Sequence, residues 1–161
     1  MGVDGMSQAA LDYDLCEYGG SRVRFRGPAK PLDRDFVAFL GGTDTFGRFI
    51  PKPFPALVEE RIGVDSVNLG VVNAGADLYL KDGASMAVAQ RARAVVLQVP
   101  GAANLTNRYY SVHPRRNDRF LRATPMLEAL YPEIDFTEFH FVRHMLASLA
   151  ALSPQRSEEH T

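Results

Sequence analysis

The sequence predicts an α/β protein, built as a three-layer α/β/α sandwich around a parallel sheet. Three short apolar runs, at residues 36–40, 66–69 and 94–99, are bounded by turn residues, which is typical of buried parallel strands. Helical patterns fill the stretches between these runs, and strand–helix–strand units close into right-handed crossovers. We therefore expect the three strands to be parallel neighbours in one sheet.

The first two elements are a strand over 36–40 and a helix over 54–62. The strand ends at Gly41 and Gly42, which permit a sharp turn of the backbone. The helix follows Pro53 and stops at Gly63, in keeping with the preference for proline at the start of a helix and glycine after its end.

The remaining elements follow the same reasoning. A helix over 84–93 has an arginine-rich end, which suits a helix C-terminus. Two more helices are predicted. One covers 125–131 and is capped by Thr124, and the other covers 138–152 and is capped by Thr137. The last helix carries an apolar stripe at helical spacing, made of Val142, Met145, Leu146 and Leu149.

Composition limits the classes of function. The 161 residues suit one domain, and 46% hydrophobic residues are enough for a core. The net charge of −1 gives no reason to expect nucleic acid or an anionic membrane as a partner. No apolar run approaches the roughly 20 residues of a membrane-spanning helix. The single cysteine, Cys16, forms no internal disulfide, so a reducing cytoplasm fits best, and the oligomeric state is left open.

We divide the chain into an arm and linker over 1–35, the α/β domain over 36–155 and a tail over 156–161. The tail resembles the translation of a sequencing adapter. Two interpretations stay open: the tail is an artefact and the domain is truncated at its C-terminus, or the tail is a solvated charged segment.

Polar and small residues follow each of the three predicted strands, in loops over 41–47, 68–77 and 101–107. Because the carboxyl ends of parallel strands meet at one edge of a sheet, these loops are expected to share a ligand pocket. Its candidate residues are Gly42, Thr43, Asp44, Asn73 and Asn104. The structural alternatives are turn hydroxyls at Thr43 and Thr45, a cap at Asp44, and loop ties at Asn68 and Asn73.

The first loop and its strand resemble the glycine-rich block of the SGNH, or GDSL-like, hydrolase superfamily. Residues 67–70 resemble its second block, and Asn104 resembles its third. The resemblance implies a flavodoxin-like sandwich in which Thr43 is the nucleophile, while Gly70 and Asn104 form the oxyanion hole. Gly42 and Thr43 stand where the superfamily has aspartate and serine, and no Asp-x-x-His follows the third strand. The stretches 53–55 and 109–122 resemble more closely a bacterial domain family of unknown function built on this fold.

Residues 108–122 contain five arginines and one acid, Asp118. Guanidinium groups suit phosphate, sulfate or carboxylate, so Arg115, Arg116 and Arg119 are candidate ligands for an anion at the pocket. The alternative is a solvated loop that pairs with Glu128, Glu133 and Asp135.

Two functions remain open at this stage: hydrolysis of an ester, with His113 as the nearest candidate base, and non-catalytic binding of a small anionic ligand. His140 and His144 share a helix face, but no third metal ligand accompanies them. We therefore expect neither a metal nor a cofactor.

Overall fold

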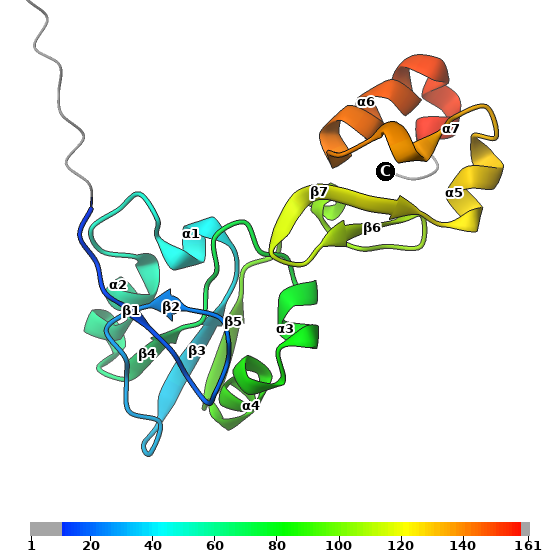
Figure 1. Cartoon of the computed structure of the whole chain (residues 1–161). Helices are drawn as coiled ribbons and strands as arrows, with labels where there is room; N and C mark the ends of the chain where they lie inside the picture. Colours follow the sequence, from blue (N-terminus) through cyan, green and yellow to red (C-terminus); the bar gives the residue numbers. More distant parts are fainter. Residues whose placement is uncertain (1–10, 159–161) are drawn as a thin grey trace, which may run out of the picture.

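The computed structural model describes residues 11–158, which form two lobes with separate hydrophobic cores (Figure 1). The sheet lobe comprises residues 11–101, and the hairpin lobe comprises residues 102–158. Of the predicted arm and tail, residues 1–10 and 159–161 lie outside the described part of the chain.

The sheet lobe is organised around strand β3 (Phe36–Leu40), which pairs in parallel with β4 (Asp65–Asn68) and with β5 (Ala94–Leu97). The three predicted strands and their parallel direction are confirmed. The expectation that successive strands are neighbours is wrong for the second and third, because the order is β4-β3-β5. The chain crosses β3 between β4 and β5, and β3 is therefore the buried centre of the sheet.

Helices cover both faces of this sheet (Figure 1). On one face, Phe39 meets Phe54 of α2 (Phe54–Ile62), with ring centroids 5.5 Å apart. On the other face, Ala38 and Leu40 share a core with α3 (Asp77–Lys81) and α4 (Gly83–Arg91). This alternation along β3 buries both of its faces. The protein is therefore a mixed α/β protein with a three-stranded parallel sheet.

Three short elements complete the sheet lobe. Strands β1 (Leu15–Cys16) and β2 (Phe25–Arg26) form an antiparallel ribbon within the predicted arm and linker. Phe25 is fully buried in the core of the sheet lobe, so this part of the predicted arm packs on the lobe. Helix α1 (Thr43–Phe46) directly follows the turn after β3.

The hairpin lobe is built on strands β6 (Tyr110–His113) and β7 (Arg116–Ala123), which pair antiparallel. The solvated loop, which was one of the two alternatives for residues 108–122, is not formed, because most of this segment lies in the hairpin. Tyr110, Val112 and Phe120 are buried on one side of the hairpin, while the arginines of β7 remain exposed. The inward residues bury enough apolar surface to stabilise two strands. The many charged residues between them make this pattern hard to recognise in the sequence.

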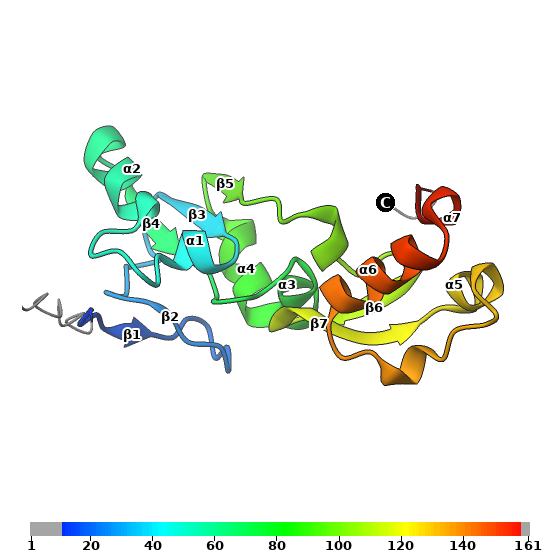
Figure 2. The same ribbon diagram turned by 90° about the horizontal axis from the view of Figure 1, so that it is seen from above.

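The rest of the hairpin lobe packs against the buried side of the hairpin (Figure 2). It contains the 3-10 helices η1 (Ala102–Asn104) and η2 (Phe136–Glu138) and the helices α5 (Pro125–Leu130), α6 (Val142–Leu152) and α7 (Pro154–Glu158). Within residues 11–158, no helix combines the length and the apolar character needed to cross a membrane.

Helix α6 begins at Val142, four residues after the predicted start. Asp135 accepts the N–H of Thr137 at 2.9 Å and closes η2, so Thr137 is not the cap of α6. Phe141 forms a β-bridge with Arg119 and is therefore extended. Both contacts hold the chain away from α-helical geometry until Val142.

Candidate functional site

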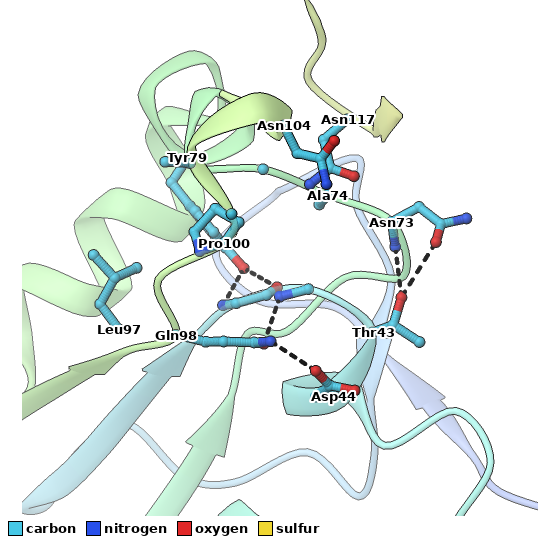
Figure 3. Close-up of a pocket in the computed structure, with 15 residues that line it drawn as sticks. Thr43, Asp44, Asn73, Ala74, Tyr79, Leu97, Gln98, Pro100, Asn104 and Asn117 are labelled. Carbon is cyan, nitrogen blue, oxygen red and sulfur yellow. Dashed lines mark hydrogen bonds between the residues drawn. The ribbon is translucent and has the colours of Figure 1, made fainter. Parts of the chain in front are cut away.

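A cleft of about 210 Å³ lies at the carboxyl ends of β3 and β5, where the two lobes meet (Figure 3). Side chains and backbone from both lobes line it. From the sheet lobe come residues 41–44, 73–76, Tyr79, Leu97, Gln98, Pro100 and Gly101; from the hairpin lobe come Asn104 and Asn117. This is the edge at which open α/β sheets bind ligands.

Thr43 and Asn73 hold two of the cleft loops together. The Thr43 hydroxyl accepts the N–H of Asn73 at 3.0 Å and donates to Asn73 Oδ1 at 3.3 Å (Figure 3). Asn73 adopts a positive φ of 59°, which asparagine tolerates better than most residues. The Thr43 hydroxyl therefore takes the loop-bonding role that was the structural alternative to catalysis.

Gln98 organises the first loop from the end of β5. Its Oε1 accepts the N–H of Gly42 at 3.0 Å and the hydroxyl of Thr45 at 2.7 Å. Its Nε2 donates to the Asp44 carboxylate at 3.0 Å. A side chain on Gly41 would collide with Thr45 and with Gln98, so the glycine is required for this close approach. Sequence reasoning missed Gln98, although it is the one polar residue in the apolar run 94–99.

Tyr79, in α3, fixes the base of the cleft. Its hydroxyl accepts the N–H of Gly41 at 2.9 Å and lies within donating distance of the carbonyl oxygens of Gly41, at 2.8 Å, and Leu69, at 2.7 Å. Burial raises the pKa of the Tyr79 phenol, so the hydroxyl stays protonated as a donor. No pattern in the sequence points to this role, because Tyr79 lies inside a helix and does not follow a strand.

Asn104 and Asn117 bring the hairpin lobe to the cleft. The hairpin is tied to the sheet lobe by backbone hydrogen bonds from Gly75 N–H to Pro114 O, at 3.2 Å, and from Asn117 N–H to Asn73 O, at 2.9 Å. A Cβ on Gly75 would lie 3.3 Å from Asn117 Cβ, so the two lobes approach closely there. Within residues 11–158, neither the Asn104 nor the Asn117 carboxamide has a hydrogen-bond partner. Figure 3 shows the two side chains next to each other at the cleft.

The structure brings five of the predicted site residues together and leaves four apart. Gly42, Thr43, Asp44, Asn73 and Asn104 line the cleft. Gly70 is buried outside it, and its N–H donates to Asn68 Oδ1 at 2.9 Å. Arg115, Arg116 and Arg119 are exposed on the hairpin, beyond the lining of the cleft. Asn117, which the sequence did not single out, joins the site because the hairpin folds back to it.

Two of the three acids proposed as partners for the hairpin arginines, Glu133 and Asp135, have other partners. Glu133 forms an ion pair with Arg156 at 2.8 Å, and the hydrogen bond from Arg156 lowers the pKa of Glu133. Asp135 accepts the hydroxyl of Thr137 at 2.6 Å. In the described part of the chain, no acid forms an ion pair with Arg115, Arg116 or Arg119. The pairing that was the alternative to anion binding is therefore not formed.

His113, His140 and His144 are not among the residues that line the cleft. His113 Nδ1 accepts the N–H of Arg115 at 3.2 Å, and the His144 ring packs edge-on against Phe139. Residues 11–158 hold no cluster of three or more histidine, cysteine, aspartate or glutamate side chains suited to a metal ion. No histidine from this range lines the cleft.

The fold and the cleft define a mixed α/β protein with a polar site at the carboxyl edge of a parallel sheet. The model of a family described as "Domain of unknown function (DUF6473)" matches residues 1–159, and the chain belongs to this family. The predicted membership of a domain family of unknown function is confirmed. No curated protein and no solved structure matches the chain, and nothing in these comparisons links it to the SGNH hydrolases.

Proposed function

We propose that the cleft binds a small polar ligand that carries an acidic group, and that it does so without catalysis. The observation that supports this most is the pair of carboxamides, Asn104 and Asn117, which face the cleft without partners in the described chain. A carboxamide offers two donors and an acceptor, and an unpaired one at a cleft is ready to bind hydroxyl, carbonyl or carboxylate groups.

The positive charge beside the cleft supports the proposal that the ligand carries an acidic group. Arg115 lies in the turn of the hairpin and Arg116 begins β7, beside Pro114 and Asn117, whose backbone is hydrogen-bonded to the cleft loop. Guanidinium groups bind carboxylate and phosphate in a bidentate manner. The Asp44 carboxylate lines the cleft from the sheet lobe and repels an anion there. The ligand would therefore lie with its acidic group toward the hairpin turn.

Hydrolysis of an ester by an SGNH-like mechanism is the second candidate. It is favoured by one observation: Thr43 and Asn104, the nucleophile and oxyanion donor that the resemblance implies, line the same cleft. It is disfavoured by the engagement of the Gly70 N–H with Asn68, and by the absence of a histidine base from the lining residues within 11–158. Non-catalytic binding is consequently the first proposal.

The proposal is tested by thermal shift with phosphate, glycerol phosphate and succinate as probes and uncharged glycerol as the reference. Binding to the folded state stabilises it by RT ln(1 + [L]/Kd), about 2.7 kcal/mol at 100 times Kd. We expect at least one anionic probe to raise the melting temperature, and the double variant Asn104→Ala, Asn117→Ala to abolish that rise. The control is Gln90→Ala, which removes an exposed carboxamide of α4 that does not line the cleft. An equal shift in the double variant would contradict the proposal.

The role of the arginines is tested with Arg115→Ala, Arg116→Ala and Arg119→Ala combined. The matched control combines Arg22→Ala, Arg61→Ala and Arg143→Ala, which removes the same charge from other exposed positions. Loss of the anion response in the first variant and not in the control supports recognition at the hairpin turn. Equal loss in both would assign the response to net charge.

The catalytic alternative is tested with Thr43→Ser on a panel of short acyl esters. Serine keeps the hydroxyl and removes the methyl that crowds attack, so activity should appear if the geometry suits catalysis. Asn104→Ala should then lower that activity about 100-fold. A folded, inactive Thr43→Ser protein would leave binding as the function.

A further inference from the structure

Strand β5 presents an open apolar edge. It pairs with β3 on one side, and on its other side no strand from residues 11–158 accompanies it. Its side chains are exposed: Val95 is 50% accessible, Val96 41% and Leu97 52%, and the following Val99 is 79% accessible. Residues 94–99 contain neither a charge nor a proline. Proteins usually protect an exposed sheet edge with such residues, because unpaired N–H and C=O groups recruit another strand.

The opposite edge of the sheet is protected. Along β4, Ser66, Val67 and Asn68 are buried, and α2 packs against the strand. Asp65 at its start is ion-paired with Arg34 at 2.7 Å. The exposure of β5 is therefore specific to one edge and is not a general property of this small sheet.

We infer that a second copy of this chain covers β5, through antiparallel pairing of the two β5 strands around a two-fold axis. With the axis between Val95 and Val96, Val95 of each copy lies opposite Val96 of the other, and Ala94 lies opposite Leu97. Apolar side chains then meet apolar side chains at every position of the strand. An interface of this symmetry is self-complementary and closes as a dimer, and the two sheets become one continuous sheet.

Charge at the two ends of β5 selects the antiparallel arrangement. In this register Arg93 lies opposite Gln98 of the other copy, and the Gln98 carboxamide holds the Asp44 carboxylate at 3.0 Å. Arg93 is exposed and has only a long ion pair, 3.6 Å, with the exposed Asp35. The two-fold axis thus brings Arg93 of each copy toward Asp44 of the other copy, so the favourable contact occurs twice in the dimer. A parallel arrangement in matching register would bring Arg93 toward Arg93 and Asp44 toward Asp44, which is repulsive.

The test is the molar mass in solution over a range of concentrations, measured by light scattering after size exclusion. The wild-type chain is expected to be a dimer. Val96→Lys and Val95→Glu should each be monomeric, because each places an unpaired charge opposite a valine in the interface. An equimolar mixture of the two should recover a dimer, because Lys at 96 then faces Glu at 95. The control Leu80→Lys, at a side chain 78% exposed on α3, should remain dimeric.

Three outcomes would overturn the inference: a wild-type chain that is monomeric at every concentration, a dimer that persists in Val96→Lys, or a mixture that stays monomeric. Circular dichroism checks that each variant is folded. If the charged variants do not fold, amide hydrogen exchange of the wild type tests whether the chains pair through β5. Protection of the β5 backbone that grows with protein concentration supports pairing through this strand. Protection that is independent of concentration, or that grows elsewhere, refutes it.

Discussion

The two lobes contribute to the cleft in different ways. In the sheet lobe, the polar side chains at the cleft are bonded to one another or to the backbone: Thr43 to Asn73, Gln98 to Asp44, and Tyr79 to Gly41. In the hairpin lobe, Asn104 and Asn117 have no such partners within the described residues. The sheet lobe therefore supplies a pre-organised wall, and the hairpin lobe supplies groups that are free to bind. Substitutions in the wall should cost stability, whereas substitutions of the free amides should cost binding.

The largest expected effect concerns the two separate cores. Phe36→Ala in β3 should lower the free energy of unfolding by about 3–5 kcal/mol, and Met145→Ala in α6 by about 2–5 kcal/mol, because both side chains are buried and leave cavities. Since the cores share no residues, each substitution should increase hydrogen exchange mainly in its own lobe. The same increase in both lobes from either substitution would show one cooperative unit instead of two.

A smaller effect is expected from the buried phenols, and it compares the lobes directly. Tyr79→Phe should cost about 1–3 kcal/mol, because it leaves the buried Gly41 N–H without its acceptor. Tyr110→Phe in the hairpin lobe removes the bond donated to Ala103 O, at 2.9 Å, and the contact with the Asn107 side chain, but it leaves no buried backbone N–H without an acceptor and should cost about 1 kcal/mol. Urea denaturation of the two variants measures the difference. A larger loss in Tyr110→Phe would contradict the assignment of the pre-organised wall to the sheet lobe.

The pH dependence of the sheet lobe should include a contribution from Asp82, which caps α4. Burial of the carboxyl opposes its ionisation, but hydrogen bonds from Ser85 and Ser21 outweigh this and lower the pKa of Asp82. A carboxyl with a lowered folded-state pKa stabilises the fold above its unfolded pKa, near 4, and loses that contribution as the pH falls through the folded-state value. Asp82→Ala should therefore cost about 1 kcal/mol at neutral pH, as for the loss of a helix cap, and progressively less in acid.

The control for this pH experiment is Asp77→Ala, in the first turn of α3. Chemical denaturation at several pH values would compare both variants with the wild type. If the loss of unfolding free energy in Asp82→Ala is as large in acid as at neutral pH, ionisation of Asp82 does not contribute to the pH dependence of stability.

The strands of the sheet could be predicted from the sequence because their apolar runs are bounded by turn residues. The hairpin could not, because β6 has only two inward apolar residues, Tyr110 and Val112, β7 has only Phe120 buried among charged residues, and the register shifts twice between the strands. The order of the strands in the sheet was not predicted either, because no local sequence pattern determines whether β5 pairs with β3 or with β4.

Part of the cleft could be predicted because its residues directly follow the predicted strands. Thr43, Asp44, Asn73 and Asn104 follow strands closely, so the topology of the sheet brings them to one edge. Tyr79 and Asn117 reach the cleft from a helix and from a hairpin strand, which no strand-end rule finds. Gly70 follows a strand as well, but its N–H is used to hold Asn68, which shows that position at a strand end is not sufficient.

The central claim is that the free carboxamides of the hairpin lobe bind a ligand against the wall of the sheet lobe. Nuclear magnetic resonance of the side-chain amides, during titration with whichever anionic probe shifts the melting temperature, tests it most directly. The account predicts that the resonances of Asn104, Asn117 and Asn73 shift together, with one common Kd, while that of Gln90 stays fixed. Shifts confined to the arginines of the hairpin, with Asn104 and Asn117 unchanged, would contradict it.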